Sequence, residues 1–215
     1  MLNNLLGVIP RKPFICTIGA KCAVGKTTLK VIFAGEELKK GTNVLYLTAD
    51  DDVQIISSKF DKYLNNTTTD GNLKIINIYL AKKLYNFVNQ ELAINNYGLV
   101  IIDGAQFFVK DEISSLMVLL RSRNISVIIS TNLSNKLSMV VPVWSELVPQ
   151  FLLYMSDYVC VLDKKEEFTL DEKIKYFFMF WKSKPNREFK VIKNRYAKNT
   201  NTNIKIDFKN LIIKK

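Results

Sequence analysis

The sequence predicts an α/β fold: a mostly parallel, twisted sheet flanked by helices, with a β-meander or pair of hairpins added near the C-terminus. Before residue 158, short β-rich runs alternate with longer segments of helical periodicity, which is typical of parallel strands joined by helices. From Tyr158 onward, strand-like runs are separated by polar turns. With 215 residues, 48% of them hydrophobic, we expect a single domain over residues 1–215.

The individual elements follow from hydrophobic spacing and turn residues. Strands are expected at 14–19, 43–49, 72–78, 98–103 and 126–131, the third of them at a sheet edge, and helices at 26–40, 53–64, 81–95 and 111–123. Residues 98–103 are apolar up to their last residue, as expected for a strand buried on both faces. Further strands are expected at 157–163, 173–181, 189–195 and 203–208.

Composition excludes several kinds of chemistry. Histidine is absent, so imidazole bases and histidine-ligated metals are ruled out. Three cysteines without CxxC spacing argue against a disulfide framework or a zinc ribbon and predict a reducing compartment. No run is long enough for a transmembrane helix. The expected location is the cytoplasm, or the host cytoplasm for a viral protein.

The charge is strongly positive and unevenly distributed. The net charge is +11, and residues 182–215 contain 11 basic and 2 acidic side chains. This region therefore carries +9 of the total, and we expect the basic C-terminal β region, 158–215, to take part in binding a polyanion.

The motif GAKCAVGKTT, residues 19–28, lies between an expected strand and an expected helix. This context is the one a P-loop requires, because backbone N–H groups at a helix start can hold phosphates. We expect Lys26 to neutralise the β- and γ-phosphates and the Thr27 hydroxyl to bind Mg²⁺. The predicted ATP-binding residues are Gly19, Ala20, Lys21, Cys22, Ala23, Val24, Gly25, Lys26, Thr27 and Thr28, with Ala20 standing where the usual spacing has glycine.

Two expected strands end in carboxylates. Asp103 follows LVII and is placed to hold the water shell of Mg²⁺, although an aspartate after a strand can also cap a helix. Asp50 opens an acidic cluster at 50–52. We expect Asp50 to orient the attacking water; the alternative is that these adjacent acids form a solvated helix start.

Four further residues are candidates for sensing or completing the site. Gln106 either senses the γ-phosphate or is an ordinary helix-start residue, and Asn132 is a polar side chain at a strand end. Lys193 and Arg195 share one face of an expected strand, because strand side chains alternate. They could reach a phosphate of a neighbouring subunit, as arginine fingers do, or form a basic edge that resists aggregation.

The order and spacing of these motifs resemble the RecA-like motor domain of DnaB-type replicative helicases, including phage ones. GAKCAVGKTT is similar to the first motif of that family, Ala20 included, and NVLYLTADD resembles the segment with the catalytic glutamate, which is Asp50 here. LVIIDGAQFF resembles the Walker B segment, with Asp103 followed by the family's glutamine at Gln106.

The later motifs keep the same order. SVIISTNLSN resembles the next strand and its DNA-facing loop, with Asn132 where glutamine is usual. SEL (145–147) and SDYVCVL resemble the segments that follow, and VIKNR resembles the segment with the lysine and arginine fingers, here Lys193 and Arg195. The resemblance spans roughly residues 14–208 and does not include the family's N-terminal domain.

This resemblance implies a RecA-like P-loop fold that hydrolyses ATP with Mg²⁺ at a subunit interface. It also implies a DNA helicase that translocates on single-stranded DNA or other nucleic acid as a homo-oligomer, for which a hexameric ring is one arrangement. Membrane partners are not expected.

Two alternatives stay open. IDGAQFF is similar to the IDEAQFF segment of thymidine kinases, but Gly104 replaces an acid and the zinc-binding cysteines of that family are absent. The second alternative is a RecA-like ATPase that acts as a loader or regulator without unwinding, which would use the same nucleotide-binding residues.

Overall fold

The computed structural model describes residues 2–6, 10, 12–65, 67–78, 84–133, 148–164, 186–208 and 210–214. Within them the strands are β1 (Ile15–Ala20), β2 (Val44–Thr48), β3 (Leu73–Asn77), β4 (Leu99–Asp103), β5 (Ser126–Asn132), β6 (Tyr158–Lys164), β7 (Arg187–Asn194), β8 (Asn201–Asp207) and β9 (Ile212–Lys214). The helices are α1 (Leu2–Leu6), α2 (Lys26–Leu38), α3 (Val53–Leu64), α4 (Leu84–Ile94), the 3-10 helix η1 (Ala105–Phe107), α5 (Lys110–Ser122) and α7 (Gln150–Met155).

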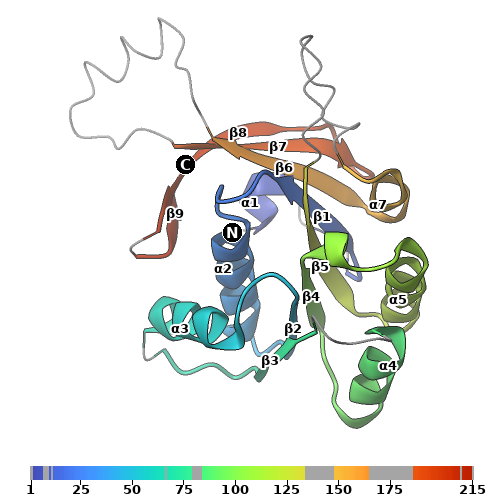
Figure 1. Ribbon diagram of the computed structural model, residues 1–215. Helices are drawn as coiled ribbons and strands as arrows, with labels where there is room; N and C mark the ends of the chain where they lie inside the picture. The colour runs from blue at the N-terminus through green and yellow to red at the C-terminus, as the bar shows by residue number, and fades with distance from the viewer. Residues whose placement is uncertain are drawn as a thin grey trace, which may run out of the picture.

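These strands form one sheet in the order β3-β2-β4-β5-β1-β6-β7-β8-β9 (Figure 1). The strands from β3 to β6 pair in parallel, whereas β6 to β9 pair antiparallel. Parallel neighbours need long crossovers and antiparallel neighbours need only turns, which explains why the helices are concentrated in the first two thirds of the chain.

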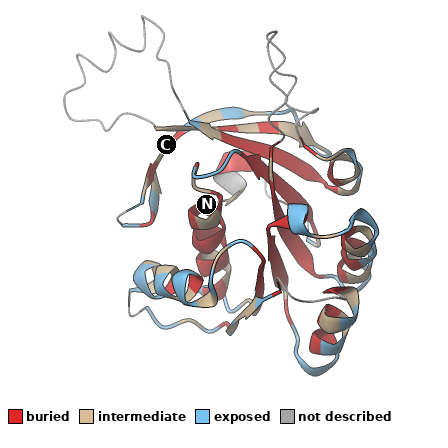
Figure 2. Cartoon of the chain, viewed as in Figure 1, coloured by how far each residue is buried: buried red, intermediate tan, exposed pale blue. Residues whose placement is uncertain are grey.

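Helices cover both faces of the parallel part (Figure 1). On one face α2 and α3 pack against residues such as Tyr46 and Ile128, and on the other α4, α5 and α7 pack against residues such as Leu47 and Ile129. Neighbouring residues of one strand enter opposite cores because their side chains alternate. Burial is therefore almost continuous along β1, β2, β4 and β5 (Figure 2).

Most expected elements lie within two residues of their predicted bounds, and α3 matches its prediction fully. Asp52 caps α3, its carboxylate accepting a hydrogen bond from the backbone N–H of Gln54 at 2.7 Å. The predicted edge strand is β3, which ends the sheet. The short elements α1, α7 and β9 were not predicted. The strand expected at 173–181 and the SEL segment at 145–147 lie outside the described residues.

Among the described residues, no helix combines the length and apolar character needed to cross a membrane.

Candidate functional site

The predicted P-loop leaves the carboxyl end of β1 and enters α2. Gly19 and Ala20 are the last residues of β1, so the loop itself covers residues 21–25. Gly25 caps α2 with φ 114°, a left-handed conformation that glycine adopts without the steric cost of a Cβ. A Cβ at Gly25 would also lie 2.9 Å from the ring of Phe208. The sequence therefore places glycine where both backbone conformation and space require it.

Lys26 is the first residue of α2, and its side chain is directed toward the neighbouring strand ends. Its Nζ donates to Asn132 Oδ1 at 2.7 Å, and to the backbone carbonyls of Lys21 and Ala20 at 3.2 and 3.3 Å. Burial lowers the pKa of Lys26, an effect that the charges of Cys22, Asp50 and Asp103 oppose. The arrangement gives a cation beside backbone N–H groups at a helix start, which suits a phosphate.

Asp103 lies at the end of β4 and is 1% exposed. Its Oδ1 pairs with Lys30 and accepts from Ser130 Oγ at 2.9 Å. Its Oδ2 accepts from Tyr46 OH at 2.9 Å and from Thr27 Oγ1 at 3.4 Å. Burial alone would raise the pKa of Asp103, but Lys30 and the two hydroxyl donors outweigh it and hold the pKa below its usual range.

The donor set near Thr27 fits Mg²⁺. In the part of the chain that the structure describes, no cluster of three or more His, Cys, Asp or Glu residues could hold a metal ion. The Thr27 hydroxyl and the Asp103 carboxylate meet beside the P-loop, and such oxygen atoms are the ligands that Mg²⁺ takes together with waters and phosphates.

The three acids after β2 have different surroundings. Asp52 caps α3, and Asp51 lies 3.6 Å from Lys59 Nζ and exchanges backbone hydrogen bonds with Thr48. Asp50 is exposed, and among the described residues its carboxylate makes no hydrogen bond or ion pair. Ala49 N donates to the carbonyl of Asp103 at 2.9 Å, so Asp50 follows directly beside the end of β4.

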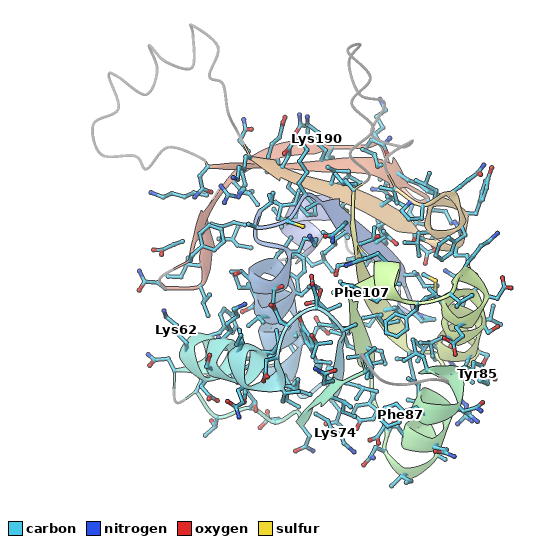
Figure 3. All side chains as sticks on the ribbon, viewed as in Figure 1. Lys62, Lys74, Tyr85, Phe87, Phe107 and Lys190 are labelled. Atoms are coloured by element: carbon cyan, nitrogen blue, oxygen red, sulfur yellow. The ribbon has the colours of Figure 1, made fainter. Side chains whose placement is uncertain are left out.

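Gln106 and Asn132 come into contact. Gln106 Oε1 accepts from the backbone N–H of Asn132 at 3.2 Å, while Asn132 Oδ1 accepts from Lys26 Nζ. The sequence placed Asn132 on a nucleic-acid loop, and the structure adds this direct contact with the P-loop lysine. Phe107, which is 49% exposed, follows Gln106 at the surface (Figure 3). A chain of contacts therefore joins the P-loop to the ends of β4 and β5.

Lys193 and Arg195 lie at the opposite end of β1 from the P-loop. Arg195 N donates to the carbonyl of Asp157, and Asp157 accepts from the backbone of Ile15, the first residue of β1. The six residues of β1 put this position roughly 16 Å along the strand from Ala20, at about 3.3 Å per residue. These two cations are therefore remote from the P-loop of their own chain.

Both fingers have partners within the chain. Lys193 Nζ donates to the backbone carbonyl of Leu153. Arg195 lies 2.8 Å from Asp157 Oδ1, and Arg121 lies 2.6 Å from Oδ2 of the same carboxylate. Asp157 is 1% exposed, whereas the side chains of the two arginines are 40–43% exposed. One buried carboxylate thus holds two guanidinium groups that face solvent.

Sequence reasoning missed several residues of the site. Arg187, at the start of β7, donates from Nε to the P-loop carbonyl of Val24 at 2.6 Å and lies over the ring of Phe208. Lys30 and Ser130 contact Asp103. A signal was present for these two, since polar residues in an otherwise apolar helix face and strand need buried partners. No local signal connects Arg187 to Val24.

No protein-family model and no curated protein matches the sequence. Solved structures do match it. A KaiC-like protein from the hyperthermophilic archaeon Pyrococcus horikoshii superposes with a TM-score of 0.67 and 14% identity, over 96% of this chain and 92% of that one. The RadB recombinase gives a TM-score of 0.66 and 17% identity, over 99% of this chain and 94% of that one. A further solved structure, an ATPase domain, gives 0.67 and 15%, over 94% and 85%.

The chain has the RecA-like fold. The predicted fold class is thereby confirmed, including the antiparallel C-terminal extension. At identities of 14–17% the likeness concerns architecture. The activity is therefore argued from the site.

Proposed function

We propose that the protein is an ATP-hydrolysing motor that translocates on single-stranded nucleic acid as a homo-oligomer, in the manner of a replicative DNA helicase core. The observation that carries this proposal is the convergence of Lys26, Thr27, Asp103 and Asn132 at the P-loop edge of the sheet. A helix N-terminus, an ammonium and a carboxylate at one edge are the parts that phosphoryl transfer requires.

The P-loop and Lys26 bind the phosphates of ATP. The backbone N–H groups of the loop and of the start of α2 hold the phosphate oxygens, and the Lys26 ammonium neutralises the charge that develops on them. At present this ammonium donates to Asn132 Oδ1. Binding of phosphate therefore requires Lys26 to exchange an amide partner for an anionic one.

Hydrolysis needs a water aligned with the γ-phosphate. Asp50 is the acid available for this task, because Asp51 and Asp52 are engaged with Lys59 and with the start of α3. Thr27 and Asp103 are the residues that would hold Mg²⁺, which supplies charge stabilisation to the phosphates when bound.

Gln106 and Asn132 are proposed to couple nucleotide state to nucleic acid. Their contact joins the segments after β4 and β5, and Asn132 is bonded to Lys26. A change in the Lys26 contacts on ATP binding or phosphate release would alter both segments together. The loops that follow Asp103 and Asn132 are the proposed contacts with the nucleic acid.

Lys193 and Arg195 are proposed to complete the site of a neighbouring subunit. Their position far from their own P-loop supports a role in trans, and the exposed guanidinium of Arg195 is accessible to a partner. We further propose that the basic C-terminal β region, 158–215, binds nucleic acid through its charge. Lys190 lies on β7, on the far side of the molecule from Lys74 of β3 (Figure 3).

The proposal is tested by ATP turnover with and without single-stranded DNA, together with size-exclusion chromatography and light scattering in ATP and oligonucleotide. We expect stimulated turnover, assembly, strand displacement and binding that weakens steeply with salt. Turnover and assembly without strand displacement would favour the loader or regulator, and phosphate transfer to thymidine would favour the kinase. A chain that stays monomeric under all these conditions would contradict the trans role of Arg195.

A further inference from the structure

Lys30 is a fully buried cation that the proposed mechanism does not use. It lies one helical turn after Lys26 on α2 and is 0% exposed. Its Nζ pairs with Asp103 Oδ1 and donates to Ser130 Oγ at 2.7 Å. Lysine is almost never fully buried unless it is paired. A lysine directed through the core at the Walker B-like aspartate therefore has a specific partner.

The pairing fills the hydrogen-bonding capacity of Asp103. A carboxylate offers about four lone-pair positions, and four donors of this chain approach them. Lys30 and Ser130 lie at Oδ1, and Tyr46 and Thr27 lie at Oδ2. A metal ion can bond directly to Asp103 only if one of these donors moves.

The local charge has the same consequence. Lys30 neutralises Asp103, and the nearby Lys26 adds a further positive charge. Asp50 and Asp51 are the other carboxylates whose charges act on Lys26, and both lie beyond the buried pair. Before nucleotide binds, a divalent cation near Thr27 and Asp103 therefore meets little net negative charge.

We propose that Lys30 is a positioning residue that keeps Asp103 from binding a divalent cation by itself, so that the metal is retained only together with the phosphates of the nucleotide. This inference rests on the proposed nucleotide site. It assigns to Lys30 an effect on metal binding that a purely structural lysine would not have.

The test measures Mn²⁺ binding to the full chain without nucleotide, using the electron paramagnetic resonance signal of free Mn²⁺. We expect weak binding by the wild type and binding at least about tenfold tighter by Lys30→Met, a difference of about 1.4 kcal/mol. Adding Asp103→Asn to Lys30→Met should abolish the gain. Lys62→Met, which removes the same charge from an exposed position on α3, should bind Mn²⁺ as the wild type does.

Lys30→Met leaves Asp103 without its ion-pair partner, so folding is checked by circular dichroism. If this variant does not fold, Lys30→Gln replaces it, because its amide can still donate to Asp103 while carrying no charge; the same gain is expected. Unchanged Mn²⁺ affinity in the folded variant, or a gain that survives Asp103→Asn, would overturn the inference. Binding of a fluorescent ATP analogue is measured separately, so loss of the proposed nucleotide site is distinguished from failure of the Lys30 proposal.

Discussion

The two ends of β7 present different solutions to placing a cation beside a phosphate. At its start, Arg187 contacts the P-loop of its own chain through the carbonyl of Val24. At its end, Lys193 and Arg195 lie beside the beginning of β1, the whole strand away from that P-loop. One antiparallel strand therefore carries basic residues toward both edges of the sheet.

The difference shows how a site can be split between subunits. Residues at the P-loop edge contact one another within the chain, as Lys26 does with Asn132 and Thr27 with Asp103. At the other edge, Asp157 holds Arg195 and Arg121 with their side chains partly exposed. In this account the first edge binds the nucleotide, and the second supplies cations to a neighbour.

The largest expected effect is at the far end of β7. Arg195→Ala should leave ATP binding intact but reduce nucleic-acid-stimulated hydrolysis by about 10³- to 10⁵-fold, because fingers in trans have effects of that size. Lys193→Ala should show a smaller loss, since an ammonium lacks the bidentate fork of arginine. Arg123→Ala, at an exposed arginine after α5, is the matched control. Equal turnover in the Arg195 and Arg123 variants would remove the functional contrast between the two edges.

The second expected effect is at the P-loop edge. Asp50→Asn should retain ATP binding and reduce turnover by about 10²- to 10⁴-fold, as expected when a positioned base is lost. Asp51→Asn and Asp52→Asn are the matched controls, because their contacts with Lys59 and α3 are structural. Nucleotide affinity and single-turnover hydrolysis are measured for all three. If Asp51→Asn shows the larger hydrolytic defect, Asp51 replaces Asp50 as the base.

Lys26→Ala tests the assignment of the P-loop itself. Removal of the ammonium should reduce ATP turnover by about 10²-fold or more, because electrostatic contacts to a developing phosphate charge contribute at that level. Phosphate release is the measurement, and Lys21→Ala, in the exposed part of the loop, is the control. Wild-type phosphate release by Lys26→Ala would reject the nucleotide site.

Arg187→Ala should have the smallest of these effects. It removes the hydrogen bond to Val24 and the contact with Phe208, and hydrogen bonds from charged groups contribute about 1.5–3 kcal/mol. Because the P-loop keeps its other contacts, we expect about a tenfold loss of ATP affinity and little change in turnover at saturating ATP. A large loss of turnover at saturation would instead place Arg187 in the chemistry.

The strand and helix periods of the sequence predicted most of the parallel core, because burial on both sheet faces leaves a clear local pattern. The bounds of α3 could be predicted because Asp52 is a local capping signal. Contacts between distant segments could not be predicted in this way. Lys30 reaches Ser130 across 100 residues, and Arg187 reaches Val24 across 163. Neither hydrophobic spacing nor motif order contains information on such pairs.

The central claim, that one subunit's P-loop works with its neighbour's Arg195, is tested most directly by mixing two inactive variants. Lys26→Ala subunits retain Arg195, and Arg195→Ala subunits retain Lys26, so a mixed interface can combine an intact P-loop with an intact finger. We predict that nucleic-acid-stimulated ATP hydrolysis returns in part when the two variants are mixed, while each alone stays inactive. Absence of any recovery, with co-assembly demonstrated by light scattering and differential tagging, would contradict the shared site.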